Sequence, residues 1–225
     1  MKEIAFGLGL GVLVAALALA AEPGYSSSVT PGLVSHYTSL FGQEVRSRLK
    51  GWQEFVRRVP ARLPANRGPS GEISLLAPVN GFFDAVAAGS VQQLWSVADY
   101  WATPAETLSV NGADCEDYAI GKYFMLKELG VPVARLRLVY VRTWFARNTA
   151  HMVLAYYASP SADPLILDNL QGGIEPARER PDLTPVYSFN DDDLQVLDGP
   201  ALRLNPASNR KWRSVLEKLQ RELSY

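Results

Sequence analysis

The sequence contains one cysteine, Cys115, which lies between acidic residues in the stretch Gly112–Ala119. Because no second cysteine is present, Cys115 cannot form an internal disulfide and is either a buried, inert thiol or a reactive one. At the start of a helix, unpaired backbone N–H groups and the helix dipole favour a thiolate, so we predict a nucleophile. The alternative is that Asp114 and Asp117 only cap the helix and Cys115 fills space in the core.

His151 and Asp168 follow the cysteine in two segments with strand character, residues 151–157 and 165–170. The turn-rich residues between these segments predict a hairpin. His151 opens the first strand and Asp168 lies near the end of the second, so antiparallel pairing would place them close together. A carboxylate that fixes the histidine tautomer and stabilises the imidazolium is what a thiol nucleophile needs. The alternative is a surface histidine with an unrelated aspartate.

The elements that must position these residues follow from the spacing of apolar side chains. From Cys115 onward, apolar residues recur at helical spacing until Gly130 and Pro132 stop the run. Alternation over residues 135–144 predicts a strand. We also predict an amphipathic helix over residues 33–59 with a break near Gly51, a helical region over 73–101 with a break at Gly89, irregular chain after Gly173, and a last helix from about Ser208.

The composition describes a globular chain with no strong charge bias. The 225 residues are 48% hydrophobic and 20% charged, with a formal net charge of -1. We therefore predict a single domain over residues 33–225 with its own core. The balanced charge gives no indication of a nucleic-acid partner.

The N-terminus has the pattern of an export signal. Lys2 precedes an apolar run over residues 4–21, and Ala18-Leu19-Ala20 has the small-x-small pattern that signal peptidase cleaves. We predict a signal peptide over residues 1–21, a flexible leader over residues 22–32 and no membrane contact after signal removal. An uncleaved membrane anchor is the alternative, because the apolar run is close to the length that spans a bilayer.

Several short strings extend over most of the predicted domain: Asp99-Tyr100-Trp101-Ala102-Thr103-Pro104, Asp114-Cys115-Glu116-Asp117-Tyr118-Ala119-Ile120, Lys122-Tyr123, Leu129-Gly130-Val131, His151-Met152-Val153-Leu154 and Leu167-Asp168-Asn169-Leu170. Together these strings resemble a known family, the bacterial transglutaminase-like cysteine proteases of the LapG type. The resemblance implies an α+β, papain-like or transglutaminase-like fold. In that fold a helical N-terminal half carrying the cysteine helix packs on an antiparallel sheet carrying histidine and aspartate.

The same resemblance implies a function. It implies a periplasmic, calcium-dependent endopeptidase with the triad Cys115, His151 and Asp168, in which Asp114, Glu116 and Asp117 bind calcium. The implied substrate is the N-terminal region of a large surface adhesin, whose release promotes biofilm dispersal. The implied inhibitor is an inner-membrane receptor for cyclic di-GMP.

Two other functions remain open at the level of sequence. A transglutaminase would use the same triad but pass the acyl group to an amine instead of water. A non-enzymatic, calcium-dependent adaptor would retain the acidic residues, with Cys115 serving only in packing. Thiol reactivity separates the adaptor from both enzymes, because a packing cysteine resists alkylation.

Overall fold

Seven strands among the described residues form one antiparallel sheet in the C-terminal half of the chain. The computed structural model describes residues 28–59, 68–89, 95–96, 99–144 and 149–225. The strand order is β4-β3-β2-β1-β5-β6-β7, so β1 and β2 lie near the middle and β7 lies at an edge. The strands are β1 (Leu136–Thr143), β2 (Thr149–Tyr156), β3 (Leu165–Leu167), β4 (Glu175–Pro176), β5 (Leu183–Phe189), β6 (Leu194–Val196) and β7 (Leu202–Leu204).

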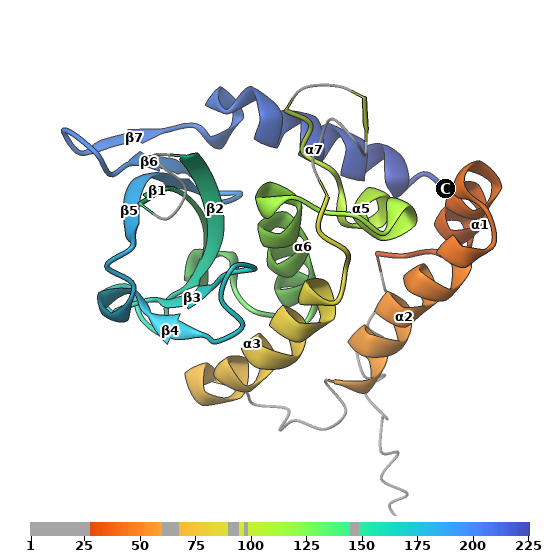
Figure 1. The fold of residues 1–225 in the computed structure, drawn as a ribbon, viewed down its shortest axis with the longest axis horizontal. Coiled ribbons are helices and arrows are strands. Elements are labelled where there is room, and N and C mark those ends of the chain that lie inside the picture. Colours follow the sequence, from red (N-terminus) through yellow and green to blue (C-terminus); the bar gives the residue numbers. More distant parts are fainter. Residues whose placement is uncertain (1–27, 60–67, 90–94, 97–98, 145–148) are drawn as a thin grey trace, which may run out of the picture.

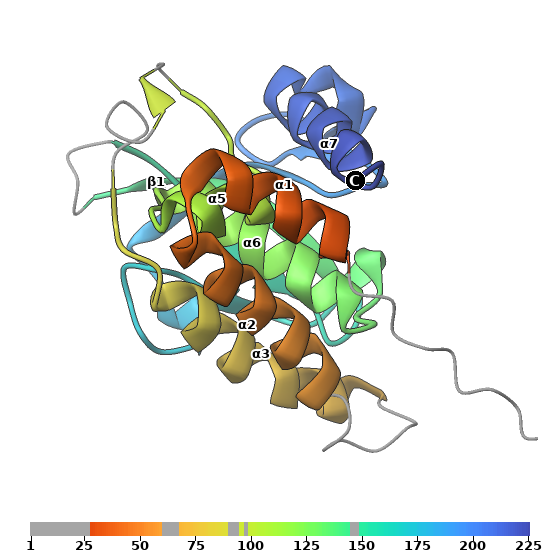
Figure 2. The same ribbon diagram turned by 90° about the vertical axis from the view of Figure 1, so that its right-hand side faces the viewer.

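The helices gather on one side of this curved sheet, with α6 between the sheet and the N-terminal helices (Figures 1 and 2). The C-terminal helix α7 runs across the top in Figure 1 and ends near α1. The helices of the described residues are α1 (Pro31–Phe41), α2 (Glu44–Arg58), α3 (Gly68–Asp84), α5 (Pro104–Val110), α6 (Cys115–Glu128) and α7 (Arg210–Glu222), with short 3-10 turns η2 (Val133–Arg135), η3 (Ala177–Glu179) and η4 (Pro206–Ser208). This arrangement confirms the predicted α+β class.

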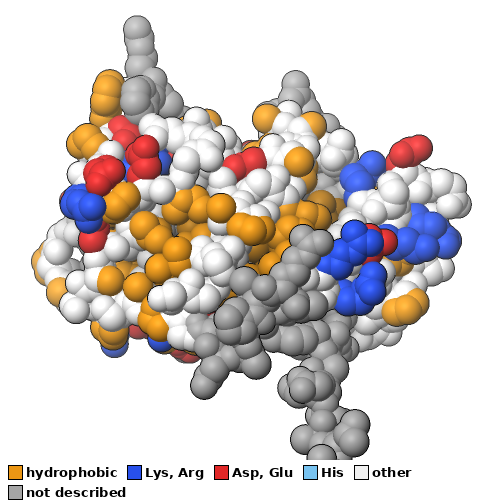
Figure 3. All heavy atoms as spheres, turned by 90° about the horizontal axis from the view of Figure 1, so that it is seen from below, with side chains coloured by type: hydrophobic (Ala, Val, Ile, Leu, Met, Phe, Trp, Pro, Cys, Tyr) orange, Lys and Arg blue, Asp and Glu red, His pale blue; other side chains and the backbone are white. Residues whose placement is uncertain are grey.

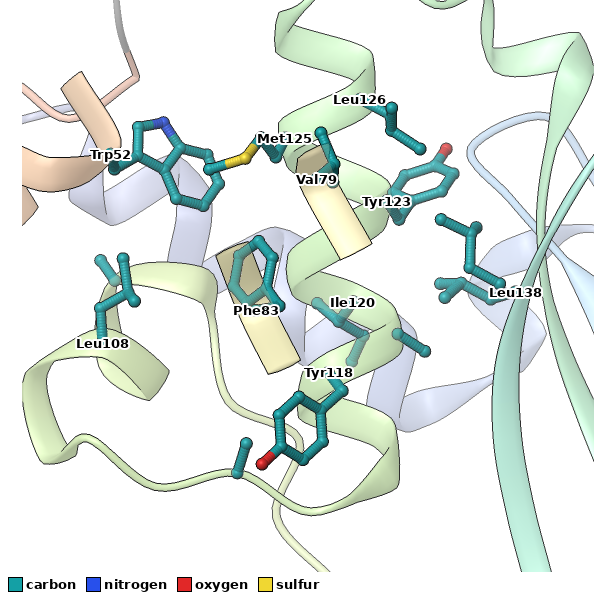
Figure 4. Packing of buried hydrophobic residues seen from close by; sticks show 14 of the residues in the cluster. Trp52, Val79, Phe83, Leu108, Tyr118, Ile120, Tyr123, Met125, Leu126 and Leu138 are labelled. Atoms are coloured by element: carbon teal, nitrogen blue, oxygen red, sulfur yellow. The ribbon is translucent and has the colours of Figure 1, made fainter. Parts of the chain in front are cut away.

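Helix α6 is the centre of the hydrophobic core. Figure 4 shows Met125 pointing toward Trp52 of α2, while Tyr123 and Leu126 lie on the side of α6 that faces Leu138 of β1. All five of these side chains are almost completely buried. A helix with buried side chains on several faces is held in place from all sides, and its first turn is therefore fixed relative to the sheet.

Two predicted helices have different boundaries in the structure. The predicted helix over residues 33–59 is two helices, because Gly42 adopts a φ of 93° that ends α1, whereas Gly51 lies inside α2. α1 already begins at Pro31, within the predicted leader, where the Thr30 side chain caps it. The first part of the predicted helical region over residues 73–101 is α3, which begins earlier, at Gly68, and ends at Asp84. Residues 90–94 and 97–98 of that region lie outside the described residues. Residues 104–110 form α5, which the apolar spacing did not predict.

The prediction of irregular chain after Gly173 was wrong. Residues 175–204 contribute β4 to β7 to the sheet, each of two to seven residues. Strands this short, interrupted by prolines and acidic residues, carry too few side chains for alternation to be visible.

The predicted signal peptide over residues 1–21 lies outside the described residues. Within the part of the chain that the structure describes, no helix is long and apolar enough to cross a membrane. On the face seen from below in Figure 1, hydrophobic side chains gather across the middle, with Lys and Arg side chains toward one edge (Figure 3).

Candidate active site

Cys115 is the first residue of α6. Asp114 is the N-cap, and its side chain accepts a hydrogen bond from the backbone N–H of Asp117 at 3.3 Å. The side chain of Asp117 in turn accepts from the backbone N–H of Asp114 at 3.4 Å, which completes a capping box. The local sequence therefore fixes Cys115 in the first helical turn, as the apolar spacing predicted.

His151 and Asp168 form a buried pair at one end of the sheet. His151 lies in β2 and Asp168 directly follows β3, which pairs with β2 in antiparallel register. His151 Nε2 lies 2.8 Å from Asp168 Oδ1, and the two residues are 5% and 1% exposed. An ionised carboxylate only accepts hydrogen bonds, so Nε2 carries a proton and Nδ1 of the neutral ring is the acceptor. The predicted proximity of these two residues is therefore observed.

The cysteine lies against the strand that carries the histidine. Helix α6 packs on β2 and β1. The backbone of Met152, the residue after His151, lies close enough to the Cys115 sulfur to lower the pKa of the thiol. The structure thus pairs His151 with Asp168 and packs the helix that begins at Cys115 on the strand that carries His151.

The immediate surroundings of the sulfur favour the neutral thiol. The pKa of Cys115 is raised by burial, then by the charge of Glu116 and by a hydrogen bond from Sγ to Glu116 Oε2 at 2.9 Å. The nearby charge of Asp114 adds to this, and the Met152 backbone opposes it. Burial and the flanking carboxylates thus outweigh the activation predicted from the helix dipole.

Asp168 has a second partner that the sequence did not indicate. Its Oδ2 accepts a hydrogen bond from Arg180 Nη2 at 2.7 Å, and its Oδ1 accepts from the Leu170 backbone N–H at 3.0 Å. Burial alone would raise the pKa of Asp168, but the hydrogen bond and charge of His151, together with hydrogen bonds from the Leu170 N–H and from Arg180, lower it to about 2. Asp168 is therefore ionised at neutral pH. Arg180 lies in a proline-containing stretch without periodicity, where no pattern distinguishes it from the exposed Arg178.

A groove of about 620 Å³ opens beside the first turn of α6. It is lined by neighbours of Cys115 and His151 and by side chains of the sheet and of α7, among them Glu116, Ala150, Tyr140, Tyr187, Trp101 and Lys211. The indole Nε1 of Trp101 is buried and has no hydrogen-bond partner among the residues that the structure describes. The volume lies within the range of sites that bind small molecules or short peptide segments.

Residues 70–182 match the family of bacterial transglutaminase-like cysteine proteinases. The chain belongs to this family.

Solved structures of LapG from Legionella pneumophila are similar over most of the chain. The EGTA-treated form is 33% identical, with a TM-score of 0.71 over 84% of this chain and 96% of that chain. The calcium-bound form is also 33% identical, with a TM-score of 0.68 over 83% of this chain and 97% of that chain. A search of curated proteins gave no match. The predicted family and its transglutaminase-like fold are confirmed.

In this cysteine proteinase the three predicted metal ligands lie within one helical turn. Burial and mutual repulsion raise the pKa of Asp114 to about 8, and burial raises the pKa of Asp117 to about 7 despite hydrogen bonds from the Ala102 and Asp114 N–H groups. Among the described residues, no three acidic, histidine or cysteine side chains already converge on one point. The first turn of α6 therefore has oxygen donors suited to a cation, but not a preformed cluster.

Proposed function

We propose that this protein is a periplasmic, calcium-dependent cysteine endopeptidase with Cys115 as nucleophile, His151 as general base and Asp168 as the residue that orients His151. The observation that carries the proposal is the buried 2.8 Å contact between His151 and Asp168, beside the strand backbone that reaches the Cys115 sulfur. Family membership supports cysteine protease chemistry.

The reaction follows from this arrangement. His151 Nδ1 takes the thiol proton as the sulfur of Cys115 attacks the carbonyl carbon of a peptide bond. The imidazolium gives this proton to the leaving amine nitrogen as the carbon–nitrogen bond breaks, which leaves an acyl group on the sulfur. His151 then takes a proton from the attacking water and returns it to the sulfur when the thioester breaks. Asp168 stays ionised and stabilises the imidazolium in both steps.

Two N–H groups support the oxyanion that forms in each step. The backbone N–H of Cys115 lies in the first turn of α6, where N–H groups have no partner within the helix. The indole N–H of Trp101 is buried and unpaired among the described residues, in the wall of the groove that Glu116 also lines. Donors that already lie in place stabilise the developing charge without reorganisation.

Asp114, Glu116 and Asp117 hold calcium in this proposal. Carboxylate oxygens are the ligands that calcium prefers, and burial is the main cause that raises the pKa values of Asp114 and Asp117, so a nearby cation would favour their ionised forms. A cation bound here also lessens the penalty on the Cys115 thiolate. The calcium-bound and EGTA-treated forms of Legionella LapG support this choice of metal.

The proposed substrate is the N-terminal region of a large surface adhesin, whose cleavage releases the adhesin and promotes biofilm dispersal. An inner-membrane cyclic di-GMP receptor is the proposed inhibitor, and the apolar run at residues 4–21 is the proposed export signal. The resemblance to LapG supports all three. The open groove beside the first turn of α6 supports an extended peptide as the occupant.

The test is cleavage of the N-terminal fragment of the host's largest surface adhesin by the mature protein, with calcium and with chelator. We expect a discrete shortening with calcium only. The Cys115→Ala variant should lose roughly 10³-fold or more in rate while its thermal unfolding stays close to that of the wild type. Retained cleavage by this variant would contradict the assignment of the nucleophile.

The same experiment separates the alternative functions. Joined products in the presence of an amine, without shortening, would indicate acyl transfer to an amine. An uncut substrate together with a Cys115 that resists alkylation in calcium would favour a non-enzymatic adaptor.

A further inference from the structure

Asp182, Arg180 and Asp168 form a buried network of ion pairs, and Asp168 also contacts His151. Arg180 Nη2 lies 2.7 Å from Asp168 Oδ2 and 2.8 Å from Asp182 Oδ2, and Arg180 Nε lies 2.9 Å from Asp182 Oδ1. Arg180, Asp168 and Asp182 are 4%, 1% and 5% exposed. Buried ion pairs of this geometry are costly to break, because a lone partner remains uncompensated.

Arg180 connects the segment that leads into β5 with the end of β3, which is not a neighbour of β5 in the sheet. After β4 at one edge, the chain passes through η3 and crosses to β5, which pairs with β1. Arg180 and Asp182 lie in this crossing, whereas Asp168 follows β3. The contact therefore holds the crossing segment against the residue that contacts His151.

The hydrogen bonds of Asp168 divide between its two oxygens. Oδ1 accepts from His151 and from the Leu170 N–H, and Oδ2 accepts from Arg180. Rotation of a carboxylate about its last torsion is soft, so the bond to Oδ2 fixes which oxygen faces the histidine and in which plane. Arg180 in this way determines the orientation of the imidazole through Asp168.

Asp182 balances the positive charge of Arg180. A guanidinium paired with Asp168 alone would cancel the negative charge that stabilises the imidazolium. Asp182 binds the same guanidinium through both of its oxygens, and the Arg180 hydrogen bonds lower the pKa of Asp182. Two carboxylates and one guanidinium carry a net charge of -1, so Asp168 remains negative toward His151 while its position is fixed.

We propose that Arg180 is a positioning residue for the catalytic pair, and that Asp182 holds Arg180 and preserves the negative charge of the group. This inference rests on the proposed function, in which Asp168 orients His151. It assigns no contact with substrate to Arg180, so its removal should change the chemical step and not substrate binding.

The test compares Arg180→Met and Arg180→Lys with the matched control Arg178→Met. Arg178 lies two residues earlier in η3, is 66% exposed at its side chain, and pairs only with Asp163 and Glu179 in the contacts of the described residues. We expect Arg180→Met to lower kcat about 10- to 100-fold with KM within about twofold. Lysine should restore part of kcat, and Arg178→Met should match the wild type.

A second readout does not depend on any substrate. Alkylation of Cys115 by iodoacetamide, in calcium, requires a correctly placed base, so Arg180→Met should slow it by a similar factor. A folded Arg180→Met protein with wild-type kcat and wild-type alkylation would overturn the inference, as would a change in KM alone. If circular dichroism shows that Arg180→Met does not fold, kcat and the alkylation rate of Arg180→Lys and Asp182→Asn test the inference instead.

The two proposals fail in different ways. A wild-type protein that cuts no substrate in any condition contradicts the proposed protease, while the alkylation rates of the variants still decide the role of Arg180. A wild-type protein that cuts, with Arg180→Met equally active, contradicts only the positioning role.

Discussion

Glu116 accepts a hydrogen bond from the Cys115 thiol and lines the groove beside it. Its charge and its hydrogen bond are, after burial, the largest causes that raise the pKa of Cys115. The neighbouring Asp114 has a raised pKa and Glu116 contributes to that increase as well. Burial and the Glu116 carboxylate therefore both favour the neutral Cys115 thiol.

A single substitution tests this control. In chelator, Glu116→Gln should lower the pKa of the Cys115 thiol and speed its alkylation at neutral pH, by about tenfold for each unit of pKa. The rate of iodoacetamide incorporation between pH 6 and 9 measures the change. Glu54→Gln, on the exposed face of α2, is the matched control and should react like the wild type. An unchanged or slower reaction of Glu116→Gln would show that burial alone keeps the thiol neutral.

At the scale of elements, the close approach of α3 and α6 fixes the helix that carries the nucleophile. Gly121 of α6 faces the ring of Phe83 on α3, and a Cβ at position 121 would lie 2.2 Å from Phe83 Cε1. Phe83 is fully buried and packs edge-on against Trp52 and Phe82, so its ring has no free space into which to move. A glycine inside a helix is thus required here by packing and not by backbone conformation.

This contact predicts opposite effects of alanine at two helical glycines. Gly121→Ala gains up to about 1 kcal/mol of helix propensity, but overpacking against Phe83 should cost about 1–3 kcal/mol. Gly81→Ala in α3, where nothing lies within 4 Å of the added Cβ, should be stabilising by up to about 1 kcal/mol. Urea unfolding of both variants measures the difference. A Gly121→Ala variant as stable as Gly81→Ala would contradict the packing argument.

The elements that carry Cys115, His151 and Asp168 were predictable from the sequence, because each has a regular pattern. α6 has apolar side chains at helical spacing up to Gly130, whose φ of 88° suits the end of a helix. β2 and β3 have apolar runs joined by turn residues, which placed His151 near Asp168. The contact with Arg180 was not predictable, because a buried ion pair between an irregular segment and a strand end has no periodicity.

At the scale of the whole molecule, the two ends of the chain support the segment that contacts the first turn of α6. Lys218 of α7 donates to the Trp101 carbonyl at 2.6 Å and to Glu106 at 2.7 Å. Glu222 of α7 accepts from Tyr37 of α1 and from Thr103. The segment held in this way includes Ala102, whose N–H donates to Asp117 at 2.8 Å. The fold thus supports the proposed calcium site from α1, α5 and α7 together.

The raised pKa values of Asp114 and Asp117 make the free energy of unfolding depend on pH when no calcium is bound. The folded pKa values of Asp114 and Asp117, about 8 and about 7, lie above the ordinary value of 3.8 for an unfolded aspartate. Between about pH 4 and pH 8 the folded state therefore binds more protons than the unfolded state at these two positions. Their contribution to the free energy of unfolding falls as pH rises through this window.

Calcium should reverse this trend, because it binds the ionised carboxylates and competes with the protons. We expect the difference in Tm between calcium and chelator to grow from pH 6 to pH 8. At free calcium of 100 times Kd the gain at the upper end is about 2.7 kcal/mol, or roughly 5–10 °C for a chain of this size. Differential scanning calorimetry at each pH measures it, with Asp114→Asn as the variant in which the pH dependence should weaken. A calcium effect on Tm that is equal at pH 6 and pH 8 would mean that the ion binds elsewhere, since a site formed by Asp114 and Asp117 must lose protons before it can hold a cation.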